Sequence, residues 1–505
     1  MSTRHPHTPT NLEQQRKLAR DLLGDARNGD PAAIARLKAV RSDAGAPRPL
    51  RLADAQLAIA REAGVDSWPK LVERLRARDI TAFRDAVSHG DVGAVTRLLR
   101  SPHVKAQVDA PMFAFGQRAV HVAAKNVAML QALIAAGADL HLRSDWENGP
   151  YGVLDNATDD TARFLLSHGL TLTPNAAARL GWIDELRQML AADPALVHAR
   201  GGDGQQPLHE AATVAIADLL LDYGADEQAR CIDHKSTAAQ YALAERPDVC
   251  RRLLERGASP DIFMPARLGD ADLARRVLDA DPDAIAARVN EPGYAPVPPL
   301  HIYCWTLGFL VSPHDVALKF GHREVYDLLV RRSPVRVRFV HAVMAGDEAG
   351  ARAFLDRDPS MMTSLARADH SRLAHAIFDG RREAAYLMLR LGFDETAGAV
   401  DGGTALHAAS WMGDVGLVEA ILARGRVPVE SRDPVHRSTP LGWAAFGSVH
   451  RRARGGDYAA VVDRLVAAGA DIHAPGNGEP LSLLEMAEGN PDVQAALRKH
   501  GATSL

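Results

Sequence analysis

Apolar residues recur along most of this chain at spacings of three and four, the period of an amphipathic helix. Leucine pairs mark the segments "DLLLDYG" (218–224), "RLLERG" (252–257) and "AILARG" (420–425). A glycine closes each segment, at the place where a left-handed residue commonly ends a helix. Shorter, alanine-rich segments precede them and read as a second helix. The pattern predicts an all-α protein built from pairs of short helices, in which neighbouring pairs bury each other's apolar faces.

Several of these helix pairs repeat one motif. "GGTALHAASWMGDVGLVEAILARG" (402–425) resembles "QQPLHEAATVAIADLLLDYGAD" (205–226), and "QRAVHVAAKNVAMLQALIAAGAD" (117–139) follows the same plan. These segments resemble the ankyrin repeat, with its T-P-L-H-x-A signature and its period of about 33 residues. The resemblance, which is to bacterial ankyrin repeat proteins, implies an ankyrin-repeat solenoid. Residues 81–501 hold 421 positions, enough for about thirteen helix pairs at that period.

The first 79 residues follow another pattern. We expect residues 1–10, "MSTRHPHTPT", to be a disordered tail, and residues 11–79 to form a helical cap over the open end of the array. Ser67 is the candidate N-cap of the last cap helix, before Trp68-Pro69. The linker "RSDAGAP" (41–47) separates two parts of this segment. The array then occupies residues 80–505, with insertions near 284–314 and 447–455.

The stretch 298–322 collects His301, Cys304, His314 and His322, residue types that bind metals. However, "PPLHIYCW" (298–305) aligns with "TALHAASW" (404–411), which makes residues 298–308 a modified inner helix. In this alignment His301 takes the place of a histidine that bonds the neighbouring turn in ankyrin repeats. A second register begins the repeat at Ser312-Pro313 and makes residues 284–311 a long loop. Only His314 lacks a place in the motif, and one residue makes no zinc site, so we predict no metal and no cofactor.

One inner-helix position just after the alanine pair is expected to face the concave side of the array. Its occupants are polar or small in the first seven repeats and large and apolar in the last five. These five are Trp305, Met344, Phe378, Trp411 and Phe446. An exposed apolar strip marks a partner surface on a soluble protein, whereas a buried one would be core. We add Tyr303 and His314 as residues that the insertion brings to this surface.

The second insertion, "GSVHRRARG" (447–455), carries His450, Arg451, Arg452 and Arg454. On a loop these side chains would suit an acidic group of a ligand, and otherwise they are simply solvated.

Composition narrows the function classes. The 59 Lys and Arg residues nearly balance the 63 Asp and Glu residues, so no nucleic-acid partner is predicted. Three cysteines and the lack of a long apolar run favour a cytoplasmic monomer without a membrane partner. The sequence contains no nucleophile elbow, P-loop, dinucleotide fingerprint or H-E-x-x-H motif, which disfavours an enzyme. We therefore expect a binding module for a protein or peptide. The alternative is a small-molecule-binding protein or enzyme with a pocket under residues 284–322.

Overall fold

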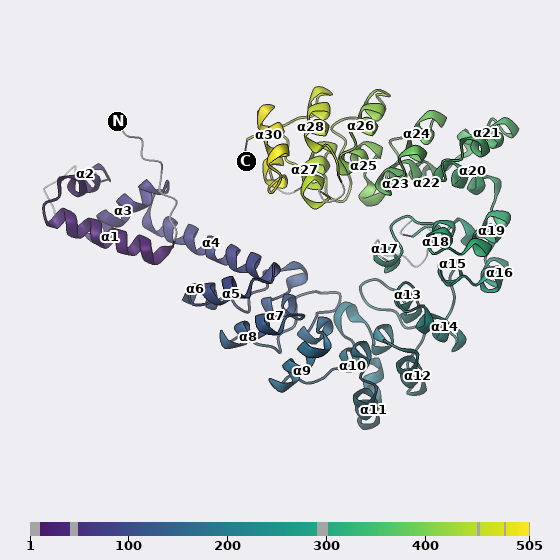
Figure 1. Ribbon diagram of the computed structural model, residues 1–505, viewed down its shortest axis with the longest axis horizontal. Coiled ribbons are helices and arrows are strands. Elements are labelled where there is room, and N and C mark those ends of the chain that lie inside the picture. The colour runs from purple at the N-terminus through teal and green to yellow at the C-terminus, as the bar shows by residue number, and fades with distance from the viewer. Residues whose placement is uncertain (1–10, 41–48, 290–300, 452–454, 479–480, 504–505) are drawn as a thin grey trace. The chain divides into compact units, whose positions relative to one another are not determined.

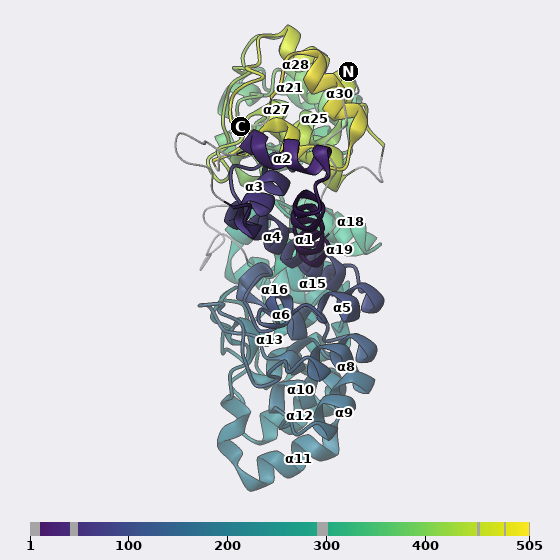
Figure 2. The ribbon, with the colours of Figure 1, turned by 90° about the vertical axis from the view of Figure 1, so that its left-hand side faces the viewer.

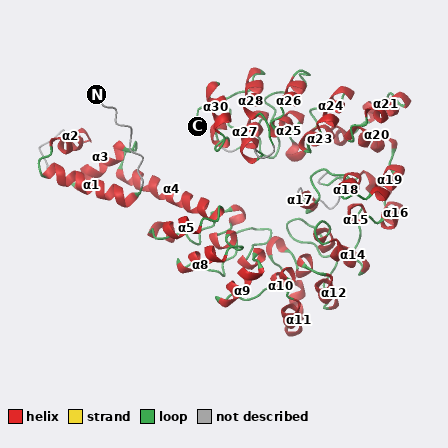
Figure 3. Ribbon diagram, viewed as in Figure 1, coloured by secondary structure: helices red, strands yellow, loops and turns green. Residues whose placement is uncertain are grey.

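The computed structural model describes residues 11–40, 49–289, 301–451, 455–478 and 481–503. The predicted disordered tail and the 41–47 linker lie outside these residues. Within them the chain is helical throughout and contains no strand, as Figure 3 shows; an isolated bridge joins Phe113 to Gln117. The all-α prediction is confirmed. No helix of the described part combines the length and apolar character that a membrane crossing requires.

The chain divides into two compact units, Met1–Asp233 and His234–Leu505. The first unit begins with a bundle of α1 (Leu12–Arg27), α2 (Pro31–Val40), α3 (Leu52–Glu62) and the start of α4 (Trp68–Ser88). These four helices pack on one another in both ribbon views (Figures 1 and 2). Their apolar residues form a core of their own, which ends at Leu71 and Leu75 of α4.

The helix α4 extends beyond the predicted boundary at residues 79 and 80. It begins at Trp68, after the expected N-cap Ser67, whose Oγ accepts a hydrogen bond from the Lys70 amide, and it continues without a break to Ser88. Its second half packs against α5 (Val92–Leu98) and α7 (Ala119–Val122). One helix therefore belongs both to the bundle and to the first helix pair, because no glycine or proline interrupts residues 70–88.

The rest of the first unit consists of short helices in succession. They are α6 (Pro102–Lys105), η1 (Ala114–Gly116), α8 (Val127–Ala135), η2 (Val153–Asn156), α9 (Asp159–Ser167), α10 (Pro174–Leu180), α11 (Ile183–Ala192), η3 (Pro194–His198), η4 (Gly202–Gly204), η5 (Pro207–Glu210) and α12 (Val214–Asp222).

The second unit continues with paired helices. They are α13 (Ala238–Ala242) with α14 (Pro247–Glu255), α15 (Phe263–Leu268) with α16 (Ala271–Ala280), α18 (Pro313–Lys319) with α19 (Arg323–Arg332), α20 (Val335–Met344) with α21 (Glu348–Arg357), α23 (Arg372–Phe378) with α24 (Arg382–Leu391), α25 (Ala405–Met412) with α26 (Val415–Leu422), α27 (Pro440–His450) with α28 (Tyr458–Ala467), and α29 (Leu483–Met486) with α30 (Pro491–Lys499). Short segments lie between pairs: η6 (Pro282–Ala286), α17 (Tyr303–Thr306), η7 (Met361–Ser364), α22 (Arg367–His370) and η8 (Val400–Gly402).

Like helices of successive pairs pack side by side at the C-terminal end of this unit (Figure 1). The first helices form the row α23, α25, α27 and α29, and the second helices form the row α26, α28 and α30. Alanines 405, 408, 409, 444 and 445 are fully buried between the first helices, where a larger side chain would hold the backbones apart. Residues 339–502 share one apolar core.

A Gly-Asp turn separates the two helices of several pairs. Gly413 has a φ of 67°, the left-handed conformation that glycine adopts without strain, and it is the C-cap of α25. Asp414 follows as the N-cap of α26 and accepts the Leu417 amide at 3.0 Å. Gly269-Asp270 does the same between α15 and α16. Together the two residues end one helix and start the next within a single turn.

The stretch 298–322 follows the second of the two registers considered. Helix α18 begins at Pro313 after the N-cap Ser312 and packs on α15 of the preceding pair, whereas α17 has only four residues. Of the two alternatives, the inner helix at 298–308 is therefore the one that the described residues 301–308 contradict. The Nδ1 of His301 accepts the Tyr303 amide two residues ahead. In α25 the Nδ1 of His407 accepts the Thr404 amide three residues behind, and its Nε2 donates to the Ser438 carbonyl of the next turn.

The second predicted insertion is also corrected. Residues 447–450 are not a loop but the last turn of α27, with Gly447 and Ser448 buried. Gly447 fits there because an added Cβ would meet the Trp411 backbone at 2.8 Å.

Candidate functional site

A pocket of about 480 Å³ opens along the row of first helices in the second unit. Four aromatic side chains make most of its apolar wall: Phe378 of α23, Trp411 of α25, and Trp443 and Phe446 of α27. The other residues that line it are Phe309, His375, Asp379, Asp401, His436, Ser438, Arg451, Asn477 and Met486. The pocket thus spans several helix pairs and the turns between them.

The aromatic rings contact one another edge to face or at a tilt. Trp443 is central, with ring centroids 5.7 Å from Phe378 and 6.0 Å from Trp411. Trp411 also lies 6.0 Å from Phe446. Trp443 is only 6% exposed and its Nε1 donates to Asp433 at 2.8 Å, so this indole is fixed in the core. Phe446 is 42% exposed and presents an apolar ring to solvent.

Three of the five residues predicted as a strip meet in this pocket: Phe378, Trp411 and Phe446. Trp305 is 61% exposed but belongs to α17, outside the row, where its ring packs on the edge of Phe309. Met344 is not on an exposed surface. It is 2% exposed because the end of α20 packs into the apolar core.

Tyr303 and His314 are completely buried and do not line the pocket. The Tyr303 hydroxyl donates to Asp261 at 3.0 Å. His314 Nε2 bonds to the Ser333 hydroxyl at 2.8 Å, and its ring lies 4.0 Å from that of His341. His314 occupies the leucine position of a Ser312–Asp315 version of the T-P-L-H motif, which explains its burial.

Two residues of the predicted basic group lie beside the pocket. The His450 ring lies tilted against Phe446, with ring centroids 3.9 Å apart, and Arg451 lines the pocket at the C-cap of α27. Arg452 and Arg454 lie outside the described residues.

The structure disfavours metal binding by the histidines and the cysteine of the stretch 298–322. Burial raises the pKa of the Cys304 thiol to about 12, so the sulfur stays protonated. Among the residues that the structure describes, His301, Cys304 and His314 belong to no group with ligand atoms close enough to share an ion.

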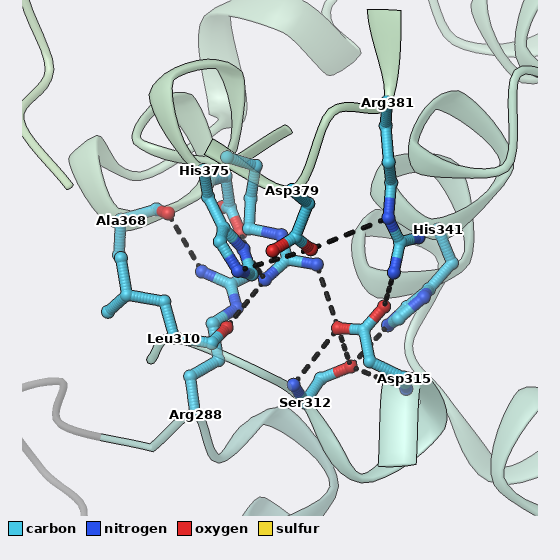
Figure 4. Close-up of polar contacts among 11 residues, drawn as sticks. Arg288, Leu310, Ser312, Asp315, His341, Ala368, His375, Asp379 and Arg381 are labelled. Atoms are coloured by element: carbon cyan, nitrogen blue, oxygen red, sulfur yellow. Dashed lines mark hydrogen bonds and ion pairs between the residues drawn. The ribbon is translucent and has the colours of Figure 1, made fainter. Parts of the chain in front are cut away.

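A buried network of charged residues lies next to the pocket (Figure 4). At its centre the Arg372 guanidinium donates to Asp315 at 2.8 Å, to the Leu310 carbonyl at 2.6 Å and to His375 Nδ1 at 2.7 Å. Asp315 also accepts the Ser312 amide and hydroxyl, at 3.0 and 2.8 Å. It therefore replaces the motif histidine as the cap of α18 and joins that helix to α23.

Further arginines surround this centre. Arg381 Nη2 lies 3.4 Å from Asp315 Oδ1. Arg288 donates to Asp369 at 2.9 Å and to the Ala368 carbonyl at 2.8 Å, and Arg336 pairs with the other Asp369 oxygen. The network ties the loop before α18 to α22 and α23.

The pKa shifts follow from burial and from these charges. Burial alone would raise the pKa of Asp315, but Arg372 and its other cationic neighbours hold it well below its usual range. Burial lowers the pKa of His375 far below its usual value, and the Arg372 charge adds to the effect. Asp315 is therefore ionised and His375 neutral.

Sequence reasoning missed Arg372, His375 and Asp379. The available signal was Arg372 itself, a charged residue in a short apolar helix, "RLAHAIF" (372–378), where no exposed face was needed. A buried arginine requires a carboxylate partner. Its partner Asp315 lies 57 residues earlier in the chain, and no local pattern connects the two.

Comparison with known proteins agrees with this architecture over one helix pair. An ankyrin repeat family model matches residues 401–434, which contain α25 and α26. No curated protein matches the chain. The chain thus contains an ankyrin repeat, which is generally a protein–protein interaction module.

Proposed function

We propose that this chain is an ankyrin-repeat solenoid that binds a protein or peptide partner through the first-helix face of its C-terminal half. The observation that carries the proposal is the aromatic pocket of Phe378, Trp411, Trp443 and Phe446. Aromatic side chains contribute disproportionately to binding at protein interfaces, particularly where they form a pocket. The pocket lies on the same row of helices as the matched repeat at 401–434.

The enzyme alternative gains no support from the pocket. Neither Tyr303 nor His314 reaches it, and Phe309 is the one residue that the 284–322 segment contributes among those described. His375 is unsuited to act as a general base, because its Nδ1 lone pair already accepts a hydrogen bond from Arg372. An aromatic pocket that opens to solvent is better suited to binding a side chain of a partner than to catalysis.

Replacement of Trp411 by alanine tests the proposal. Short random peptides displayed on phage and selected on the full chain should include binders whose affinity falls by about 2 kcal/mol or more in Trp411→Ala. The free energy of unfolding, measured by urea titration, should fall by less than the roughly 3–5 kcal/mol typical of a buried aromatic residue.

Two further alanine variants serve as controls. Trp443→Ala should show the full cost of a buried aromatic, because this indole is 6% exposed. Phe115→Ala, at a 52% exposed ring of the first unit, should change neither stability nor peptide binding appreciably. A loss of stability in Trp411→Ala equal to that in Trp443→Ala, with no change in peptide affinity, would contradict the proposal.

A further inference from the structure

Asp379 gives the pocket a partly buried carboxylate without a strong partner. It caps α23 directly after Phe378, and its side chain is 35% exposed. Its Oδ2 lies 3.5 Å from His375 Nε2 and 3.5 Å from Arg381 Nε, both longer than a strong charged hydrogen bond (Figure 4). Burial raises the pKa of Asp379 above its usual value, and the Asp315 charge adds to the rise, while Arg381, Arg372 and Lys319 lower it.

Neither neighbour supplies Asp379 with a positive charge of its own. Arg381 is shared with Asp315, which its Nη2 contacts at 3.4 Å. His375 is 2% exposed and neutral. Since its Nδ1 accepts from Arg372, the ring hydrogen lies on Nε2, which has no hydrogen-bond partner in the described part of the chain and faces Asp379. Asp379 is therefore held by two long contacts, and the arginine in contact with it is shared with Asp315.

The remaining groups of the pocket also suit a cation. Aromatic faces attract cations, and Phe378 and Trp411 line the pocket together with Asp379. A second carboxylate, Asp401, stands on a turn beside the pocket, 3.2 Å from His436. Among the described residues that line the pocket, Arg451 is the one lysine or arginine. It is the C-cap of α27, two first helices away from α23.

Other occupants fit less well. An acidic side chain would meet the carboxylates of Asp379 and Asp401. A purely apolar side chain would take water from Asp379 and leave the carboxylate without compensation, which is costly. A long basic side chain satisfies both walls, because its alkyl part packs on aromatic rings while its charged end reaches a carboxylate.

Resting on the peptide-binding function proposed above, we propose that the pocket selects a lysine or arginine side chain of the partner. Its charge pairs with Asp379, and its alkyl part lies against Phe378 and Trp411. The partner is accordingly a basic segment of a protein or peptide.

Peptide selection followed by paired substitutions tests this inference. Phage-displayed random peptides are selected on the full chain and counter-selected on Trp411→Ala, which keeps the binders that use the pocket. These should be enriched in lysine or arginine at one position. Replacing that residue by norleucine, which keeps an alkyl chain and removes the charge, should weaken binding about tenfold or more.

Asp379→Asn should cause a similar loss for the basic peptide and little loss for its norleucine form, so that the two changes are not additive. Asp327→Asn, at an exposed carboxylate paired with Arg323 on α19, is the matched control and should have no effect. Circular dichroism melts establish that Asp379→Asn is folded. Binders that depend on Trp411 but show no basic enrichment, or that ignore Asp379→Asn, would overturn this inference and leave the proposed function intact. If no peptide depends on Trp411, both fail.

Discussion

Arg372 and Asp315 show how a single pair of residues joins distant parts of the repeat array. Their side chains are 1% and 5% exposed. Removing one member of such a pair leaves the other charge buried, so Arg372→Met should lower the free energy of unfolding by about 3–5 kcal/mol in urea titrations. Arg323→Met breaks an exposed pair with Asp327 and should cost no more than about 1 kcal/mol. Equal losses in the two variants would mean that the buried pair adds no more to stability than an exposed one.

Single buried histidines also make the free energy of unfolding depend on pH. Burial lowers the pKa of His314 and of His407 to about 4, from an unfolded value of about 6.5. Below pH 6.5 the unfolded chain binds protons that the folded chain excludes, so stability falls as the pH decreases from about 6.5 to about 4, by up to about 1.4 kcal/mol per pH unit for each histidine.

A glutamine cap elsewhere in the chain suggests a substitution that removes the titration of one buried histidine. Gln240 Oε1 accepts the Thr237 amide at 2.9 Å, the same cap that His407 provides to Thr404. His407→Gln should therefore keep the cap and reduce the slope of unfolding free energy between pH 6 and pH 4. An unchanged slope would show that His407 is not the group that titrates.

At the scale of elements, the helix pairs and their turns follow from local sequence, whereas helix α4 does not. The Gly-Asp turn at residues 413 and 414 is a strong local signal, because the glycine ends one helix and the aspartate caps the start of the next. The expected break near residue 80 rested on a change of pattern and not on a helix-breaking residue. A pattern change alone does not end a helix.

Replacing Thr81 by proline tests whether α4 is continuous or whether a new helix starts at this position. Thr81 is exposed, so its replacement loses little packing. Inside a continuous α4, Thr81→Pro removes a backbone hydrogen bond and should cost about 3 kcal/mol in urea titrations, whereas Thr81→Ala should be neutral or slightly stabilising. Tolerance of the proline would instead place a helix start at this position, where proline is favoured.

For the whole molecule, the sequence predicts the class of fold but not the complete site. Periodicity predicts the all-α architecture because each helix pair carries its own apolar stripe. The sequence left two registers open near 298–322, because "PLH" at 299–301 also imitates the motif. The chain instead starts the pair at Ser312, where Asp315 reaches Arg372. Phe378, Trp411 and Phe446 were predicted from their register, but Trp443 and Asp379 belong to the pocket through contacts between repeats, which no single segment reveals.

The sharing of α4 between bundle and array has a mechanical consequence. A helix of 21 residues is about 32 Å long and stiff over that length. Because its C-terminal half is fixed against α5 and α7, the helix acts as a lever with its fulcrum at the first repeat. The free half is about 16 Å long, so a tilt of roughly ten degrees displaces the far end by roughly 3 Å. A pair of fluorophores, one on α1 and one on α8, would convert slight changes of twist in the first repeats into a measurable change of energy transfer.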